Sequence, residues 1–187
     1  MIVGLYSSVP QSGKSTVKNI FVERGFKALS LAEPVKQNLL TFLQSLDVEQ
    51  PERYLYSDWK TKVIPELGCT GGYFMSTYAT DFMRDMINPE IWLNILLRKI
   101  NHDNHYIVDD MRFPNEYNAF DCRILVINNT AKQDHDRSSK SEGLLDDYKF
   151  DYRIINNPCF GIPYLSDLTN QVIDNILTSH IKNSPTS

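Results

Sequence analysis

The feature that most limits the possible folds is an apolar segment followed by a glycine-containing loop and a helix. Ile2–Tyr6 has the apolar character of a buried strand, Ser7–Gly13 is a polar loop, and Ser15–Arg24 has apolar residues at helical spacing. From Ser8 to Ser15 the chain matches the phosphate-loop pattern G-x-x-x-x-G-K-[ST], except that serine replaces the first glycine. This order of elements predicts an α/β domain with a phosphate site after its first strand.

The residue types in this loop suit a bound nucleotide. Backbone N–H groups and the helix N-terminus would surround the β-phosphate, and Gly13 permits close approach of the backbone. Lys14 would neutralise β- and γ-phosphate oxygens, and the Ser15 hydroxyl would bind the Mg²⁺ that bridges them, with Thr16 nearby. We therefore predict an ATP site formed by Ser12, Gly13, Lys14, Ser15 and Thr16. The alternative is an ordinary turn with a capping serine.

The rest of the chain alternates between strand and helix patterns. Further strands are expected at Phe26–Leu31, Tyr106–Val108, Ile124–Ile127 and Tyr152–Ile155. Helices are expected at Pro34–Leu46, Phe74–Met83, Pro89–Ile100, Asn115–Phe120 and Leu165–Ile181. Val48–Gly72 has the mixed pattern of helix fragments and a loop. The alternation predicts a three-layer α/β fold with a mostly parallel sheet.

Composition argues against several classes of protein. The 187 residues suit a single domain over residues 1–183, with residues 184–187 as a disordered tail. No apolar run approaches the roughly 18 residues of a membrane span, and Met1–Ser15 does not resemble a signal peptide, so we expect a cytoplasmic protein that binds no membrane. The net charge of −4 argues against a broad nucleic-acid surface. The three scattered cysteines argue against a disulfide framework or a zinc site.

A pair of carboxylates follows another predicted strand. Asp109 and Asp110 come directly after Tyr106–Val108, at the end of the strand where open α/β sheets bind ligands. Asp110 would hold the metal through water or receive the acceptor's proton, and Asp109 would be a solvated neighbour. A helix cap or turn is the alternative role for this pair.

The seven residues from Asp110 to Glu116 read D-M-R-F-P-N-E. With this segment the chain resembles the bacteriophage deoxynucleoside monophosphate kinases, in which the corresponding segment reads approximately D-x-R-F-P-N-E. Similar landmarks recur in order at Ala32–Lys36, Thr80-Asp81, Trp92, Ser141-Glu142 and Asp151–Asn156. The chain departs from the family pattern at Gln11, Tyr73, Ser76, Ala79 and Ser139.

The resemblance implies a P-loop kinase fold with a five-stranded parallel sheet, a helical acceptor-binding insertion at about residues 33–100 and a short lid at about residues 130–148. It implies ATP and a deoxynucleoside monophosphate as substrates and Mg²⁺ as cofactor, and it leaves a homodimer open. The implied catalytic residues are Lys14, Asp110 and Arg112, with Ser15 and Asp110 at the metal. The implied acceptor-binding residues are Lys36, Arg84, Trp92, Arg112 and Glu116, and the implied lid cations are Arg137 and Lys140.

Some of these residues have an alternative structural role. A tryptophan on an amphipathic helix also suits the core, and Arg137 and Lys140 also suit a solvated loop. For the whole chain, the leading hypothesis is phosphorylation of a deoxynucleoside 5′-monophosphate to the diphosphate. The alternatives are a P-loop kinase that acts on another phosphomonoester or a modified nucleoside, and a catalytically weak nucleotide-binding module that regulates a partner.

Overall fold

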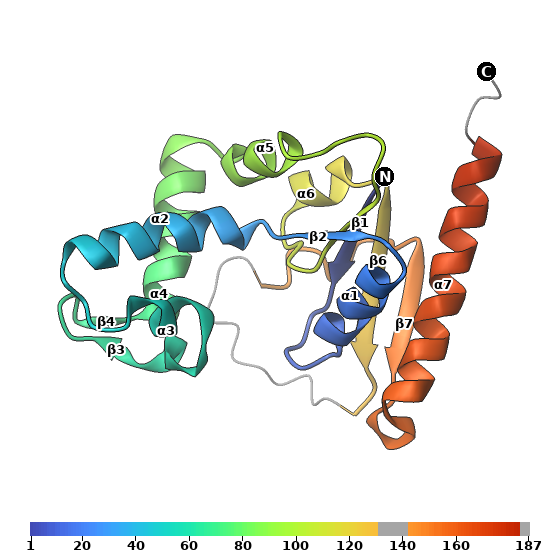
Figure 1. Cartoon of the computed structure of the whole chain (residues 1–187), viewed down its shortest axis with the longest axis horizontal. Helices are drawn as coiled ribbons and strands as arrows, with labels where there is room; N and C mark the ends of the chain where they lie inside the picture. Colours follow the sequence, from blue (N-terminus) through green and yellow to red (C-terminus); the bar gives the residue numbers. More distant parts are fainter. Residues whose placement is uncertain (131–141, 184–187) are drawn as a thin grey trace. The chain divides into compact units, whose positions relative to one another are not determined.

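The computed structural model describes residues 1–130 and 142–183 (Figure 1). The chain forms two compact units. Unit 1 combines Met1–Leu29 with Ile100–Ser187, and unit 2 is Ser30–Lys99. The insertion expected at about residues 33–100 covers nearly the same residues as unit 2.

Unit 1 is built around a sheet of five strands in the order β2-β5-β1-β6-β7. Every neighbouring pair in this sheet is parallel. The strands are β1 (Ile2–Tyr6), β2 (Lys27–Leu29), β5 (Tyr106–Val108), β6 (Cys122–Asn128) and β7 (Tyr152–Asn156). The predicted α/β fold with a parallel five-stranded sheet is therefore confirmed, and all four predicted strands after β1 are present with small shifts in their ends.

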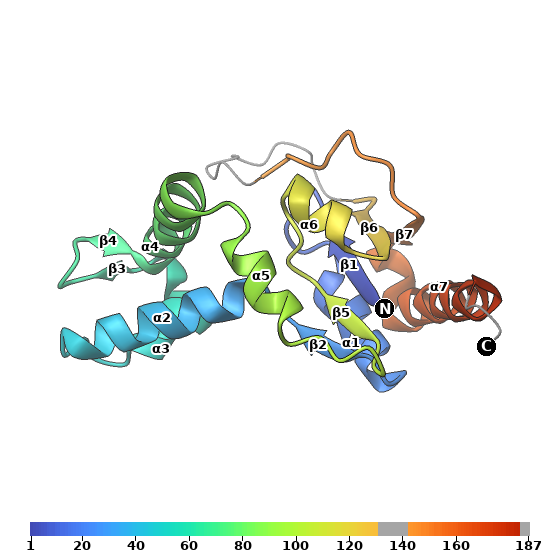
Figure 2. The same cartoon turned by 90° about the horizontal axis from the view of Figure 1, so that it is seen from above.

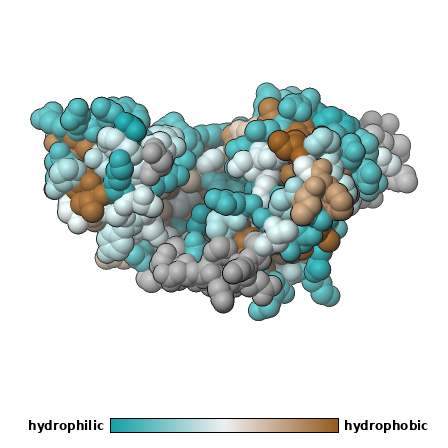
Figure 3. Space-filling model, turned by 90° about the horizontal axis from the view of Figure 1, so that it is seen from below, coloured by the Kyte–Doolittle hydropathy of each residue, from teal (hydrophilic) through white to brown (hydrophobic). Residues whose placement is uncertain are grey.

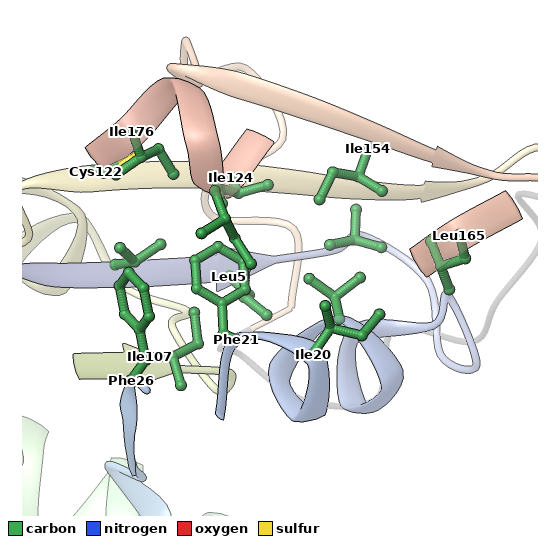
Figure 4. Close-up of a cluster of buried hydrophobic side chains, with 14 residues drawn as sticks. Leu5, Ile20, Phe21, Phe26, Ile107, Cys122, Ile124, Ile154, Leu165 and Ile176 are labelled. Carbon is green, nitrogen blue, oxygen red and sulfur yellow. The ribbon is translucent and has the colours of Figure 1, made fainter. Parts of the chain in front are cut away.

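One face of this sheet is covered by α1 (Lys14–Glu23) and α7 (Gly161–Asn183). Alternate strand residues meet apolar side chains of these helices, because successive residues of a strand point to opposite faces. Figure 4 shows Leu5 and Ile124 of the strands close to Phe21 of α1. These residues form one continuous buried core, to which Leu165 and Ile176 of α7 contribute.

The opposite face carries α6 (Pro114–Ala119), as Figure 2 shows. Gly4 in the centre of β1 permits close packing there. A Cβ atom at this position would lie 2.5 Å from Phe120 Cδ2 and 2.8 Å from Met111 Sδ. Both residues are buried, so the side chains on either side of α6 rest directly on the backbone of β1. The sheet thus forms the middle of three layers.

Unit 2 is mainly helical. Its elements are α2 (Ala32–Ser45), α3 (Pro51–Tyr56), the 3₁₀-helix η1 (Asp58–Thr61), β3 (Val63–Ile64), β4 (Cys69–Thr70), α4 (Gly71–Ser76), the π-helix η2 (Thr77–Ile87) and α5 (Ile91–Leu97). The antiparallel pair β3–β4 lies in the stretch for which only helix fragments and a loop were expected. Two residues in each strand are too few to show the alternation that identifies a strand in sequence.

The surface shown in Figure 3 is largely hydrophilic, and apolar side chains form separate patches on it. Within residues 1–130 and 142–183, none of the helices combines the length and apolar character that a membrane span requires.

Candidate functional site

The phosphate loop connects β1 to the first turn of α1. Gly13 is the N-cap of α1 with φ +99°, and Gln11 also has a left-handed backbone, with φ +54°. Ser8, which occupies the place of the usual first glycine, is not among the described residues with positive φ. The loop therefore makes its left-handed turns at positions other than Ser8, and a serine fits there without strain.

The predicted ATP-site residues follow one another along this loop and helix. Ser12 is buried, and its hydroxyl has no hydrogen-bond partner within the described part of the chain. Ser15 is exposed and Thr16 half-buried on the first turn of α1. The first turn of this helix contains no acidic residue, so the partial positive charge of the helix N-terminus is not neutralised by its own sequence.

Two asparagines at the ends of sheet strands donate hydrogen bonds to the loop. Asn128 Nδ2 donates to the Gln11 carbonyl at 3.2 Å, and Asn156 Nδ2 donates to the Ser12 carbonyl at 3.0 Å. Neither contact was predicted from the sequence. The available signal was that two predicted strands are each followed by a pair of asparagines, and that the carboxyl ends of parallel strands meet at one edge.

Lys14 is half-buried in a charged environment. Partial removal of the ammonium group from water lowers the pKa of Lys14, and the Arg112 guanidinium lowers it further. The carboxylates of Asp109 and Asp110 act on this pKa in the opposite direction. Lys14, Arg112 and the aspartate pair, predicted from two separate motifs, are therefore near enough to interact electrostatically.

The first of the two aspartates forms an ion pair with α1. Lys18 Nζ lies 2.8 Å from Asp109 Oδ2, and both side chains are mostly buried. Lys18 is one helical turn after Lys14 on α1, so successive turns of the helix place one lysine at the loop and one on Asp109. Lys18 was not among the predicted site residues, although its i, i+4 spacing from Lys14 is visible in the sequence. Asp109 is thus ion-paired, whereas we expected a solvated side chain.

Glu116 shapes the segment that follows β5. Its side chain is buried, and Oε2 accepts hydrogen bonds from the backbone N–H groups of Arg112 at 2.7 Å and Phe113 at 3.0 Å. The carboxylate therefore caps α6 and fixes the backbone at Arg112. The Arg112 residue itself is exposed.

Three predicted acceptor residues belong to unit 2. Lys36 Nζ lies 4.9 Å from the centre of the Tyr56 ring, and Arg84 is buried in the π-helix η2. Trp92 is also buried, and its indole Nε1 donates to the Ala79 carbonyl at 3.0 Å. The Trp92 contacts match the core role that was its alternative.

The predicted lid cations Arg137 and Lys140 lie outside the described residues. Within the described ranges, no group of three or more His, Cys, Asp or Glu side chains could hold a metal ion.

Comparison with protein-family models and with curated protein sequences found no match. The solved structures that resemble this chain include TT1252 from Thermus thermophilus, with 15% identity, a TM-score of 0.53, and coverage of 96% of this chain and 97% of that chain. Another is dephospho-CoA kinase from Campylobacter jejuni, with 16% identity, a TM-score of 0.44, and coverage of 94% and 96%. At 15% identity, the similarity to TT1252 concerns the fold alone. The TM-score of 0.44 for the dephospho-CoA kinase supports no inference.

Proposed function

We propose that the protein is an ATP-dependent phosphotransferase that converts a deoxynucleoside 5′-monophosphate to the diphosphate. The observation that carries this proposal is the position of Lys14. It follows a phosphate loop with left-handed turns at Gln11 and Gly13, and it interacts with Arg112 and the aspartate pair. Such a site combines an anion-binding backbone, two cations and carboxylates at the edge of a parallel sheet, which suits phosphoryl transfer.

The loop would hold the donor. Backbone N–H groups and the N-terminus of α1 would bind the β-phosphate, and the Lys14 ammonium would compensate charge on the β- and γ-phosphates. The lowered pKa of Lys14 agrees with this role, because a cation that is partly desolvated before binding interacts strongly with an anion.

The oxygen-bearing side chains around the loop suit Mg²⁺, which needs few protein ligands, better than they suit a metal ion whose ligands all come from the protein. Mg²⁺ usually binds to one or two protein oxygen ligands and completes its shell with substrate phosphates and water. Ser15 and Asp110 would supply such oxygens, and Mg²⁺ would neutralise charge on the transferring phosphate. The absence of a three-residue metal cluster in the described part of the chain is compatible with this arrangement.

For the acceptor, we propose that Arg112 binds the monophosphate. Its backbone is fixed by Glu116, so Glu116 would act by positioning Arg112. Asp110 would hold the metal through water, or would receive the acceptor's proton where the monophosphate binds in its protonated form. The choice of a deoxynucleoside monophosphate depends on the D-M-R-F-P-N-E segment and its family resemblance. Lys36 and Arg84 are further proposed acceptor residues.

The test is to incubate the full chain with ATP, Mg²⁺ and each common deoxynucleoside monophosphate in turn, and to follow diphosphate formation by chromatography. We expect ADP and one deoxynucleoside diphosphate to form in equal amounts. Lys14→Ala is the control for a contaminating kinase and should yield neither product. Equal ADP formation with and without every acceptor would instead indicate a nucleotide hydrolase and would contradict the proposal.

A further inference from the structure

We propose that Asn128 and Asn156 are positioning residues that hold the phosphate loop in its binding conformation, a role that rests on the proposed function because it concerns the phosphates of ATP. Each side-chain amide donates to a loop carbonyl, Asn128 to Gln11 at 3.2 Å and Asn156 to Ser12 at 3.0 Å. The two carbonyls belong to successive peptide units, so the pair fixes a continuous piece of the loop.

Peptide geometry connects these contacts to anion binding. In a trans peptide unit, the C=O of one residue and the N–H of the next point to opposite sides. The Gln11 carbonyl shares its unit with the Ser12 N–H, and the Ser12 carbonyl shares its unit with the Gly13 N–H. Because both carbonyls are held by asparagines at strand ends, the two N–H groups are directed away from those asparagines. Successive N–H groups directed to one side form an anion-binding site.

The backbone of the loop needs such support. Gln11 has φ +54°, a conformation that a residue with a Cβ atom rarely adopts unless its surroundings impose it. The Asn156 side chain is also packed tightly against the loop. A Cβ atom on Gly13 would lie 2.8 Å from Asn156 Nδ2. Asn156 therefore restrains Gly13 by contact and Ser12 by a hydrogen bond.

The two asparagines are themselves placed by rigid elements. Asn128 is the last residue of β6 and Asn156 the last residue of β7, and the parallel register pairs them directly. A site supported by strands is held more accurately than one supported by loops. The next residue, Asn129, is exposed, and its backbone N–H donates to the Asn156 carbonyl. Asn129 therefore offers a matched control with the same side chain, which makes no hydrogen bond to the loop in the described part of the chain.

The experiment is to titrate the full chain with inorganic pyrophosphate and with ATP by calorimetry, without an acceptor. Asn128→Ala and Asn156→Ala are compared with Asn129→Ala, and the circular dichroism and melting temperature of each variant are recorded. We expect each loop-facing variant to bind pyrophosphate and ATP about 10-fold more weakly, and Asn129→Ala to bind within about 2-fold of the wild type. In the kinase assay, KM for ATP should rise while KM for the acceptor stays unchanged.

A purely structural role would lower the melting temperature without changing affinity in the folded protein. Unchanged pyrophosphate affinity in both loop-facing variants would therefore overturn the positioning role. If Asn156→Ala does not fold, Asn128→Ala decides, because its hydrogen bond is exposed and its loss disturbs the core less. Wild-type binding of pyrophosphate without phosphate transfer to any acceptor would contradict the proposed function alone. Absence of pyrophosphate and ATP binding in the wild type would contradict both proposals.

Discussion

Lys18 Nζ lies 2.8 Å from Asp109 Oδ2, an ion pair that joins α1 to the residue directly after β5. The pairing occupies Asp109 with a lysine of α1 and assigns it a structural role. The role at the metal or the acceptor's proton is proposed for the neighbouring Asp110 from its place in the D-M-R-F-P-N-E segment. Two residues with the same side chain should consequently respond differently to the same substitution.

We expect Asp110→Asn to lose most phosphotransferase activity, because an amide cannot replace the negative charge at the metal or accept the proton. Asp109→Asn should cost less activity and should lower the free energy of unfolding by about 1 kcal/mol or less, as for other partly exposed ion pairs. The measurements are kcat for both variants and urea unfolding. Equal losses of kcat would show that the two roles are wrongly assigned.

The charge of Lys14 should control ATP binding and its dependence on pH. Lys14→Ala should abolish turnover and weaken ATP binding while circular dichroism stays unchanged, because the side chain contributes charge and no core packing. In the wild type the pKa of Lys14 is lowered from 10.5, so the ammonium loses its proton at a lower pH than an ordinary lysine. ATP affinity should therefore fall at a lower pH than it would with an ordinary lysine, in a range where the phosphates are already fully ionised.

Lys14→Arg is the control for this pH dependence, because a guanidinium stays protonated throughout the range. Its ATP affinity should be nearly independent of pH over the same range. Calorimetry at several pH values provides the measurement. A wild-type affinity that stays constant while circular dichroism shows a folded protein would argue against Lys14 as the phosphate-binding cation.

Removal of Arg112 should affect the acceptor and spare the donor. We expect Arg112→Ala to lower kcat/KM for the acceptor by about 10²–10³-fold, equivalent to about 2–4 kcal/mol, with ATP affinity nearly unchanged. Arg112→Lys should recover only part, since lysine keeps the charge but lacks the planar fork that binds two phosphate oxygens. Separate titrations of ATP and acceptor test this division. If Arg112→Ala lost ATP affinity and kept a normal kcat/KM for the acceptor, Arg112 would belong to the ATP site and this assignment would be wrong.

Arg84 gives a useful contrast to Arg112. Its side chain is buried in unit 2, whereas Arg112 is exposed. Arg84→Ala should lower the melting temperature as well as any acceptor affinity, because truncation of a buried charged residue leaves its surroundings unsatisfied. A variant with wild-type stability would show that the buried guanidinium contributes nothing to the folding of unit 2.

The histidine directly before β5, His105, should make stability depend on pH. His105 contacts the rings of Phe26 and His180, and burial lowers its pKa below 6.5, with smaller effects from the N-terminal amine and His180. The unfolded chain therefore binds a proton more readily than the folded chain. Stability contributed by neutral His105 is complete above pH 6.5 and is lost as the pH falls through the lowered pKa.

Urea unfolding between pH 7.5 and 5.5 measures this effect. His105→Gln should reduce the fall in stability over that interval, whereas the exposed His102→Gln should not change it. Identical slopes in the wild type and His105→Gln would assign the pH dependence to other groups.

The parts of the fold that depend on local sequence pattern were predicted correctly, whereas the roles of the site residues stay predictions. The five strands and the phosphate loop were predictable because apolar runs, a glycine and a following helix are visible within a few residues. The contact partners of individual side chains were not predictable from the sequence. The hydrogen bonds from Glu116 to the backbone of Arg112 and Phe113 were not predicted, and the Asn128 and Asn156 contacts to the loop join residues more than a hundred positions apart. Periodicity shows which face of an element is buried, but it does not show which distant group lies against it.

The order of the strands has a consequence for synthesis of the chain on the ribosome. β1 lies between β5 and β6, and β2 pairs only with β5, so neither of the first two strands has a partner before Tyr106 has been made. All of unit 2 is translated in the meantime. The apolar strand Ile2–Tyr6 therefore emerges long before the strands that cover its edges, and such exposed edges favour aggregation and chaperone binding. A ribosome-bound chain halted at Lys99 should leave β1 open to protease, and one halted beyond Asn156 should protect it.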